Sequence, residues 1–211
     1  GNINDALIIA SSRGFTRVFI IGDIILSGGD FSQGIVFYGQ SEILTHCILD
    51  DLANVDNCEF QNMNISGILD NNNIIRKCEI DEIESYDGLI IGCGLNGGIT
   101  MGGFAQTSVV NCYSNVAGTN TPYIDIGSGS ALAIRGWEGG IELRNKTGND
   151  PVSIDLASGQ VNIAPTCTAG SITIRGVGNI TDDSGAGCNV EHGKLLHADI
   201  INTILDTLDT S

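Results

Sequence analysis

Four carboxylates surround one tyrosine in the middle of the chain: Asp81, Glu82, Glu84 and Asp87 beside Tyr86. Most glycan hydrolases use two carboxylates that flank the glycosidic bond, and a tyrosine beside carboxylates is also typical of a sugar-binding groove. The competing interpretation is a solvated edge in a chain that is acidic throughout, and this is the one we favour. We therefore predict no catalytic residue, while glycan hydrolase or lyase activity stays open.

The three histidines, His46, His192 and His197, are the other candidates for acid–base chemistry. The sequence lacks the GxSxG turn that presents the serine of an α/β-hydrolase. His46 precedes Cys47, which we expect to point inward, so His46 should point outward. Structural roles are favoured for all three histidines, although His197 could line a three-fold axis and bind an ion there. No calcium-binding loop or P-loop occurs, Asp182-Asp183 is expected to lie in a turn, and no metal or cofactor is predicted.

The seven cysteines contain no CxxC pair. Cys47, Cys58 and Cys78 stand in similar contexts, and Cys112 stands in a looser fourth one. Free cysteine behaves as a small buried apolar residue, so stacked interior positions are favoured over metal ligands, in a chain made in a reducing cytoplasm. Trp137 is the only tryptophan. It could be a stacking platform for a sugar, a core plug or an inter-subunit anchor, and a structural role is favoured.

The composition favours many short strands joined by tight turns. The 211 residues include 29 glycines, 31 isoleucines and only three prolines, and β-branched residues are enriched in strands as glycine is in turns. Nine basic residues against 25 acidic ones give a net charge of −16. This charge argues against a nucleic-acid partner, and no apolar run is long enough for membrane insertion.

The first half of the chain reads as a quasi-repeat. A short helical turn over residues 5–14 precedes strand-like segments that alternate with Asn/Asp/Gly clusters. Cys58 and Cys78 lie 20 residues apart in matching Cys-Glu-Phe/Ile triplets, and a period near 20 predicts one coil of a parallel β-solenoid. Asparagine is expected at coil corners, because it tolerates the left-handed conformation. The predicted strands are 17–21, 23–27, 35–38, 42–49, 55–60, 74–80 and 89–91.

The second half shows stricter alternation of apolar and polar residues. This period of two predicts strands with one buried and one wet face. Their spacing permits a sandwich, a barrel or further solenoid faces. The six predicted strands are 124–126, 132–134, 141–143, 152–156, 161–163 and 172–174.

The last segment changes period, with Ile201, Ile204 and Leu208 at heptad-like spacing. So short an apolar stripe must dock either on its own β-body or on the same segment of other subunits. The predicted organisation is a β-solenoid section with a short N-terminal cap over residues 1–118, a regular short-strand β section over 119–190 and a C-terminal helix over 191–211.

Three strings carry a resemblance to a known family: residues 132–148 (LAIRGWEGGIELRNKTG), 152–161 (VSIDLASGQV) and 170–178 (GSITIRGVG). They resemble a module repeated in tail-fibre, tailspike and other appendage proteins of tailed bacteriophages. Upstream segments around Phe15, Gly39 and Asn57 are similar to its opening coils, so the resemblance covers roughly residues 14–182. It implies a β-structured appendage, usually trimeric. The expected fold is thus an all-β parallel solenoid (β-helix) running into a β-prism-like or further solenoid section, in an intertwined homotrimer.

These observations predict a structural virion appendage for host-surface attachment. One alternative is a glycan-depolymerising β-helix tailspike, and another is a neck or capsid fibre or adaptor module that binds another virion protein. The expected partners are two further copies of the chain, other virion proteins, and a host cell-surface glycan or receptor whose binding residues the sequence does not identify. The expected location is the virion, after assembly in the host cytoplasm.

Overall fold

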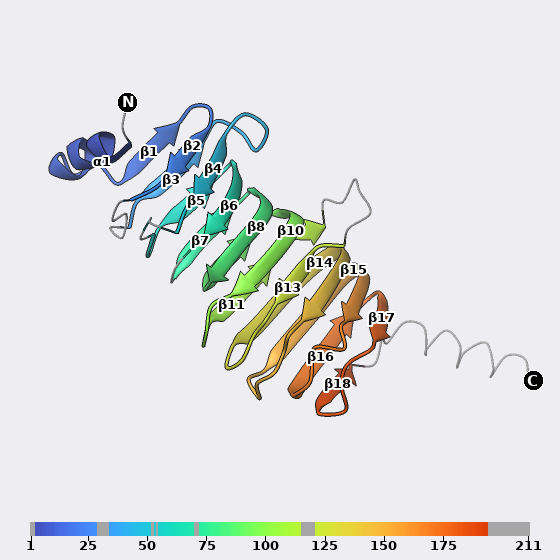
Figure 1. Ribbon diagram of the computed structural model, residues 1–211. Coiled ribbons are helices and arrows are strands. Elements are labelled where there is room, and N and C mark those ends of the chain that lie inside the picture. The colour runs from blue at the N-terminus through green and yellow to red at the C-terminus, as the bar shows by residue number, and fades with distance from the viewer. Residues whose placement is uncertain are drawn as a thin grey trace, which may run out of the picture.

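The computed structural model describes residues 3–28, 34–51, 53, 55–69, 72–114 and 121–193. It is a stack of strands that runs from a short helix at the left of Figure 1 toward the right. The helix α1 (Ile3–Ser12) confirms the predicted N-terminal helical segment, and its Leu7 is buried. None of the described helices is long and apolar enough to span a membrane. The strands are β1 (Arg17–Ile20), β2 (Ile24–Leu26), β3 (Val36–Gly39), β4 (His46–Leu49), β5 (Glu59–Gln61), β6 (Asn64–Ile68), β7 (Asn73–Arg76), β8 (Glu79–Tyr86), β9 (Gly88–Ile91), β10 (Gly94–Met101), β11 (Gln106–Val110), β12 (Tyr113–Ser114), β13 (Tyr123–Asp125), β14 (Ala131–Arg144), β15 (Val152–Ile163), β16 (Gly170–Gly176), β17 (Asn179–Asp182) and β18 (Cys188–His192).

The strands pair in parallel from coil to coil, which confirms the predicted β-solenoid. Along one face, Phe37 is the register partner of Phe60, Phe60 of Ile75, and Ile75 of Ile90. All four side chains are buried, and the Phe37 and Phe60 rings stack with centroids 5.1 Å apart. Because each coil buries its inner face only against itself and its two neighbours, the core is one continuous column.

The same pairing continues through the second half of the chain. β14 and β15 each run along more than one face of a coil and pair in parallel over most of their length. β11 and β14 lie on either side of the predicted section boundary at residue 118, and they pair in parallel, so the ladder continues from one predicted section to the next. The sequence left a sandwich, a barrel or further solenoid faces open for this half of the chain, and the structure shows further solenoid faces. Glu191 and His192 end β18, and the rest of the predicted C-terminal helix, residues 194–211, lies outside the described residues.

The predicted alternation of buried and outward residues is confirmed. In β15, Val152, Ile154 and Leu156 are buried, whereas Ser153 and Asp155 are exposed. Five of the six strands predicted in this half lie within β14 to β16, and the sixth, 124–126, extends one residue beyond β13. In the first half three predicted strands were wrong in part. Residues 42–45 of the predicted strand 42–49 and residues 55–58 of the predicted strand 55–60 lie outside strands, since β4 begins at His46 and β5 at Glu59. Residues 74–80 form two strands, because Lys77 has a φ of 49° and turns the chain between β7 and β8.

The turn at Lys77 is one of a column of corners. The equivalent positions on neighbouring coils are Asn62, Gly92, Asn111 and Gly136, and each has a φ between 52° and 67°. Asparagine and glycine tolerate this left-handed conformation best. At another corner Asn72 and Asn57 both have positive φ, and the Asn72 Nδ2 donates to the Asn57 Oδ1 at 2.7 Å. The predicted asparagine corners are therefore confirmed.

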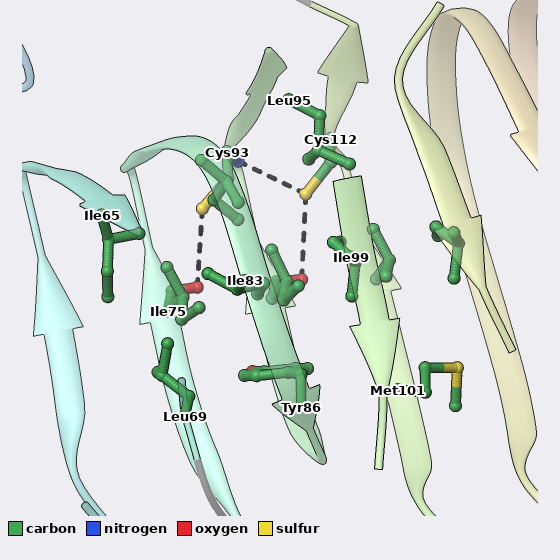
Figure 2. Close-up of a cluster of buried hydrophobic side chains, with 14 of the residues drawn as sticks. Ile65, Leu69, Ile75, Ile83, Tyr86, Cys93, Leu95, Ile99, Met101 and Cys112 are labelled. Atoms are coloured by element: carbon green, nitrogen blue, oxygen red, sulfur yellow. Dashed lines mark hydrogen bonds between the residues drawn. The ribbon is translucent and has the colours of Figure 1, made fainter. Parts of the chain in front are cut away.

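The residue after each of these corners points into the core. Cys78, Cys93 and Cys112 form a column, which Trp137 continues, since the residues that follow them are register partners. Figure 2 shows Cys93 and Cys112 side by side in the core. Cys58 does not belong to this column, because its backbone N–H bonds the Oδ1 of Asn73, 15 residues later. The repeat inferred from Cys58 and Cys78 was thus out of register.

Coil length varies although the ladder stays in register. Glu59 pairs with Ile74, 15 residues later, whereas Ser108 pairs with Ala133, 25 residues later. A period near 20 is therefore an average, and the variation is taken up at the corners.

Candidate functional site

The predicted acidic stretch lies on β8, but its tyrosine points the other way. Asp81, Glu82 and Glu84 are exposed on the outer surface. Tyr86 is fully buried, and its hydroxyl donates to the backbone oxygen of Asn73 at 2.9 Å. Burial raises the pKa of the Tyr86 hydroxyl well above its ordinary value, so it stays a neutral donor. Tyr86 therefore contributes to the core (Figure 2), and the interpretation of this tyrosine as part of a sugar groove was wrong.

Two other tyrosines, from coils further along the chain, reach the β8 carboxylates. The Tyr113 hydroxyl donates to Glu79 Oε1 at 3.1 Å, and the Tyr123 hydroxyl donates to Glu82 Oε1 at 3.0 Å. Each tyrosine is the register partner of a glycine on β10, Gly94 for Tyr113 and Gly98 for Tyr123. The glutamates are register partners of the same two glycines.

The glycines make these contacts possible. A Cβ on Gly98 would overlap the Tyr123 ring, and a Cβ on Gly94 would overlap the Glu79 carboxylate. The Tyr123 ring can therefore lie back toward β8 only because Gly98 has no side chain, and the Glu79 carboxylate has its position because Gly94 has none. This packing of an aromatic ring over a strand glycine also covers backbone that the glycine leaves bare.

The site is centred on a β-bulge that widens along the solenoid. Asp81 is the extra residue on β8 where the register with β6 shifts. On β10 two residues, Asn96 and Gly97, occupy the equivalent place, and the Asn96 Nδ2 donates to Asp81 Oδ1 at 2.9 Å. On the next coil, Tyr113 and Tyr123 are the register partners of Gly94 and Gly98, and nine residues of sequence, 114–122, lie between them. Bulges re-aim side chains and are over-represented beside functional sites.

A cation borders the site on the far side of Tyr123. The guanidinium carbon of Arg144 lies 4.1 Å from the centre of the Tyr123 ring, and Arg144 Nη2 donates to Glu142 Oε2 at 2.7 Å. Burial and the bond to Glu82 raise the pKa of the Tyr123 hydroxyl, and burial and Glu79 raise that of Tyr113. Both hydroxyls thus remain donors at neutral pH. Because Arg144 and Gly98 hold the Tyr123 ring, the freer aromatic surface is that of Tyr113, which is 40% exposed.

We define the tyrosine–carboxylate face as Glu79, Asp81, Glu82, Asn96, Tyr113, Tyr123, Glu142 and Arg144. Its carboxylates accept hydrogen bonds, which sugar hydroxyls donate, and an exposed ring can stack on the apolar face of a sugar. Glu79 and Glu82 are three residues apart on β8, so their Cα atoms are at most about 10 Å apart. This spacing permits carboxylates on both sides of a bound sugar, and each of the two already accepts a tyrosine hydroxyl.

The remaining candidates are dispersed. His46 points outward, as predicted, and its Nδ1 lies 2.6 Å from Asp23 Oδ1, whereas His192 lies at the other end of the solenoid in β18. His197 lies outside the described residues. Within the described ranges no group of three or more His, Cys, Asp and Glu side chains could hold a metal ion. The predicted turn at Asp182-Asp183 is only partly right, because Asp182 is the last residue of β17 and Asp183 is the first residue after it; the Asp182 Oδ1 accepts the Ser184 N–H at 3.0 Å.

Trp137 and the cysteines belong to the core. Trp137 is fully buried, and its Nε1 donates to the oxygen of Gly139 at 3.2 Å, so it is a core plug and neither a sugar platform nor an inter-subunit anchor. Cys47, Cys58, Cys78 and Cys112 are all buried, as predicted. Burial raises the pKa of the Cys47 thiol to about 12, so it is not a reactive nucleophile.

Sequence reasoning missed two structural features. One is the pair Tyr113 and Tyr123, whose only signal was two tyrosines downstream of the glycines of residues 94–98. The other is Lys146, which is buried and donates from Nζ to the oxygens of Gly148 and Asp150 at 2.7 and 2.8 Å. Lys146 thus anchors the turn between β14 and β15.

No family model, no curated protein and no solved structure matches the chain.

Proposed function

We propose that this chain is a structural module of a tailed-bacteriophage appendage, and that its tyrosine–carboxylate face contacts a glycan of the host surface. The observation that supports this most directly is the set of hydrogen bonds from Tyr113 to Glu79 and from Tyr123 to Glu82. They gather aromatic and acceptor groups from different coils on one outer surface. The resemblance of residues 132–148 and 152–161 to phage appendage modules gives the biological setting.

A parallel solenoid suits such a role mechanically. Its backbone ladder runs through the whole described body, so a surface built on it is held in place by its neighbours on both sides. In this proposal the mature protein is a homotrimer in the virion, attached to other virion proteins and assembled in the host cytoplasm. The acidic surface disfavours nucleic acid as the ligand.

A binding measurement on a panel of purified bacterial capsular and O-antigen polysaccharides tests the proposal. We expect at least one polysaccharide to be retained, with about tenfold weaker retention for Tyr113→Ala, since loss of a central aromatic anchor costs an interface at least this much. The matched control is Gln160→Ala, an exposed position of β15 outside the face. Absence of retention by any polysaccharide, or equal loss in both variants, would contradict the proposal.

A glycan-cleaving enzyme is the second candidate, supported by Glu79 and Glu82 on one strand beside two tyrosines. Incubation with the same polysaccharides, followed by assay of new reducing ends, separates it from binding alone. New reducing ends that disappear in Glu82→Gln would establish cleavage. Retention of a polysaccharide without new reducing ends would support attachment and contradict cleavage.

A third candidate is a neck or capsid fibre or adaptor module that binds another virion protein. It would use a protein-binding surface in place of the tyrosine–carboxylate face. Retention of polysaccharide that depends on Tyr113 distinguishes attachment from this role.

A further inference from the structure

The outer surface of the first two coils is apolar, unlike that of the coils that follow. On one face Phe19 and Tyr38 are register partners with stacked rings, centroids 5.8 Å apart, and the next residue of that column is Gln61. On the adjoining face Ile25 and Ile48 are register partners, and the next residue is Ser66. The change from apolar to polar thus occurs at the same coil on both faces.

The corner between these two faces is apolar as well. Ile21 follows β1 and is 76% exposed, and Ile43 and Leu44 lie at the equivalent corner of the second coil, where Ile43 is 81% exposed. Beside Ile21 and Ile25 lies an open hollow of about 510 Å³, also lined by Ile3 and Ala6 of α1. We define the N-terminal apolar surface as Phe19, Ile21, Ile25, Tyr38, Ile43, Leu44 and Ile48.

The size of this surface is that of a protein interface. At roughly 200 Å² for a fully exposed large side chain, the seven residues present about 800 Å². The largest apolar patch of a typical monomer is about 300–600 Å², whereas each partner of a stable complex contributes about 800 Å². An apolar surface of this area is therefore expected to be covered in solution.

The charge distribution favours another copy of this chain as the cover. Residues 13–48 carry Arg13 and Arg17 against Asp23, Asp30 and Glu42, a formal charge of −1, within a chain of −16. Two copies repel each other over most of their surface, and this nearly neutral part is where they can meet with the least repulsion. The surface also holds both projecting side chains, such as Ile43, and a hollow, as a self-complementary contact requires.

We propose that a second copy of this chain covers the N-terminal apolar surface, so that the first two coils are the self-association interface of the protein. Projecting side chains of one copy, with Ile43 foremost, fill the hollow beside Ile21 and Ile25 of the next. This inference concerns how copies assemble and does not rest on what the tyrosine–carboxylate face binds.

Sedimentation velocity on the whole chain tests the interface. At about 100 µM we expect the wild type to have a mass of at least two chains of 22.1 kDa. Ile25→Glu/Ile48→Glu should sediment as one chain, because it places two charges in the contact. The matched control, Gln61→Glu/Ser66→Glu, adds the same charges one coil later on the same two columns and should keep the wild-type mass.

Two results would overturn the proposal: a wild type of one-chain mass at this concentration, or Ile25→Glu/Ile48→Glu with the wild-type mass. Ile43→Glu, in an exposed turn, is the second variant if the pair fails to fold by circular dichroism, and it should lower the mass in the same way. Polysaccharide retention, measured on the same variants, separates this outcome from the proposed function. It should persist in a variant that has lost self-association alone.

Discussion

The backbone N–H of Cys93 donates a hydrogen bond to the Sγ of Cys112, 3.3 Å away on the next coil (Figure 2). The N–H of Cys78 makes the equivalent bond to Cys93 Sγ at 3.4 Å. Each accepting thiol in turn donates to the oxygen two residues before it, Ile91 for Cys93 and Val110 for Cys112. The thiols thus satisfy backbone groups at corners where the left-handed residue interrupts the ladder.

Cys112→Ala should destabilise the fold more than Cys112→Ser. Alanine removes the acceptor of the Cys93 N–H and leaves a buried donor without a partner, at a cost of about 2–3 kcal/mol. Serine retains an acceptor and should cost less. Urea unfolding followed by circular dichroism measures both, with Cys188→Ala, at a partly exposed position, as the control. Equal midpoints for the alanine and serine variants would refute the role of the sulfur as an acceptor.

The thiols of the column should resist alkylation in the folded protein. The hydrogen bond with Cys112 lowers the pKa of the Cys93 thiol, but hydrogen bonding with Cys78 and burial outweigh it and raise this pKa to about 12. Hydrogen bonding with Cys93 and burial raise the pKa of Cys112 as well. Since the thiolate is the nucleophile, both should stay unmodified by iodoacetamide near neutral pH. Mass spectrometry of peptides after timed labelling should show Cys188 modified first. Labelling of Cys93 at the rate of Cys188 would be inconsistent with this.

Gly98→Ala should disturb Tyr123 and be partly relieved by a second change. The added Cβ overlaps the Tyr123 ring, so the ring must leave Glu82 and Arg144, at a cost of about 1–3 kcal/mol. In Gly98→Ala/Tyr123→Ala the overlap is gone, so the double variant should cost less than the sum of the two single variants. Gly103→Ala is the control, because a Cβ there meets no atom within 4 Å. Additive costs would show that the ring does not depend on the glycine.

Lys146→Met should lower the thermal midpoint by several degrees. Methionine fills much of the same space but leaves the oxygens of Gly148 and Asp150 without their donor, which costs about 2–4 kcal/mol. For a domain of this size each kcal/mol corresponds to about 2–4 °C. Differential scanning calorimetry measures the shift, with Lys77→Met, at an exposed corner, as the comparison. A midpoint for Lys146→Met equal to that of Lys77→Met would contradict the anchoring role.

The pair Asp23 and His46 should respond to acid in a defined direction. The hydrogen bond from His46 lowers the pKa of the Asp23 carboxyl below its ordinary 3.8. A carboxyl group whose pKa is lowered in the folded protein stabilises the fold at pH values above its ordinary pKa. This contribution is lost as the pH falls through the lowered pKa. In His46→Ala the pKa of Asp23 should rise toward 3.8. Carbon-13 NMR titration of the carboxyl measures it, and an unchanged midpoint would mean that the imidazole has no such effect.

Local patterns in the sequence predicted the fold well where one coil resembles the next. The alternation in residues 152–156 reports directly which side chains face the core, because it needs no knowledge of which strand lies alongside. The interior placement of Cys78 and Cys112 follows from the same physics. The out-of-register pairing of Cys58 with Cys78 shows the limit, since matching triplets do not reveal how many residues each corner consumes.

The tyrosine–carboxylate face could not be assembled from sequence for the same reason. Tyr113 reaches Glu79 across 34 residues and Tyr123 reaches Glu82 across 41, and each span includes corners of unequal length. Tyr86, adjacent to the carboxylates in sequence, instead points inward. The bulge at Asp81 makes Ile83 the next buried residue after Ile80, and Ser85, with a φ of 58°, then turns the chain so that Tyr86 is buried. Adjacency in sequence was therefore a poor guide to adjacency in space.

The number of residues in a coil does not determine the length that the coil adds to the solenoid. Each coil lengthens the rod by one inter-strand step of about 4.8 Å, whether it contains 15 residues, as between Glu59 and Ile74, or 25, as between Ser108 and Ala133. The length of the rod is therefore set by the number of coils and not by the number of residues. Insertions at corners can change the side surface without changing the length of the rod, whereas duplication of a whole coil extends the rod by one inter-strand step.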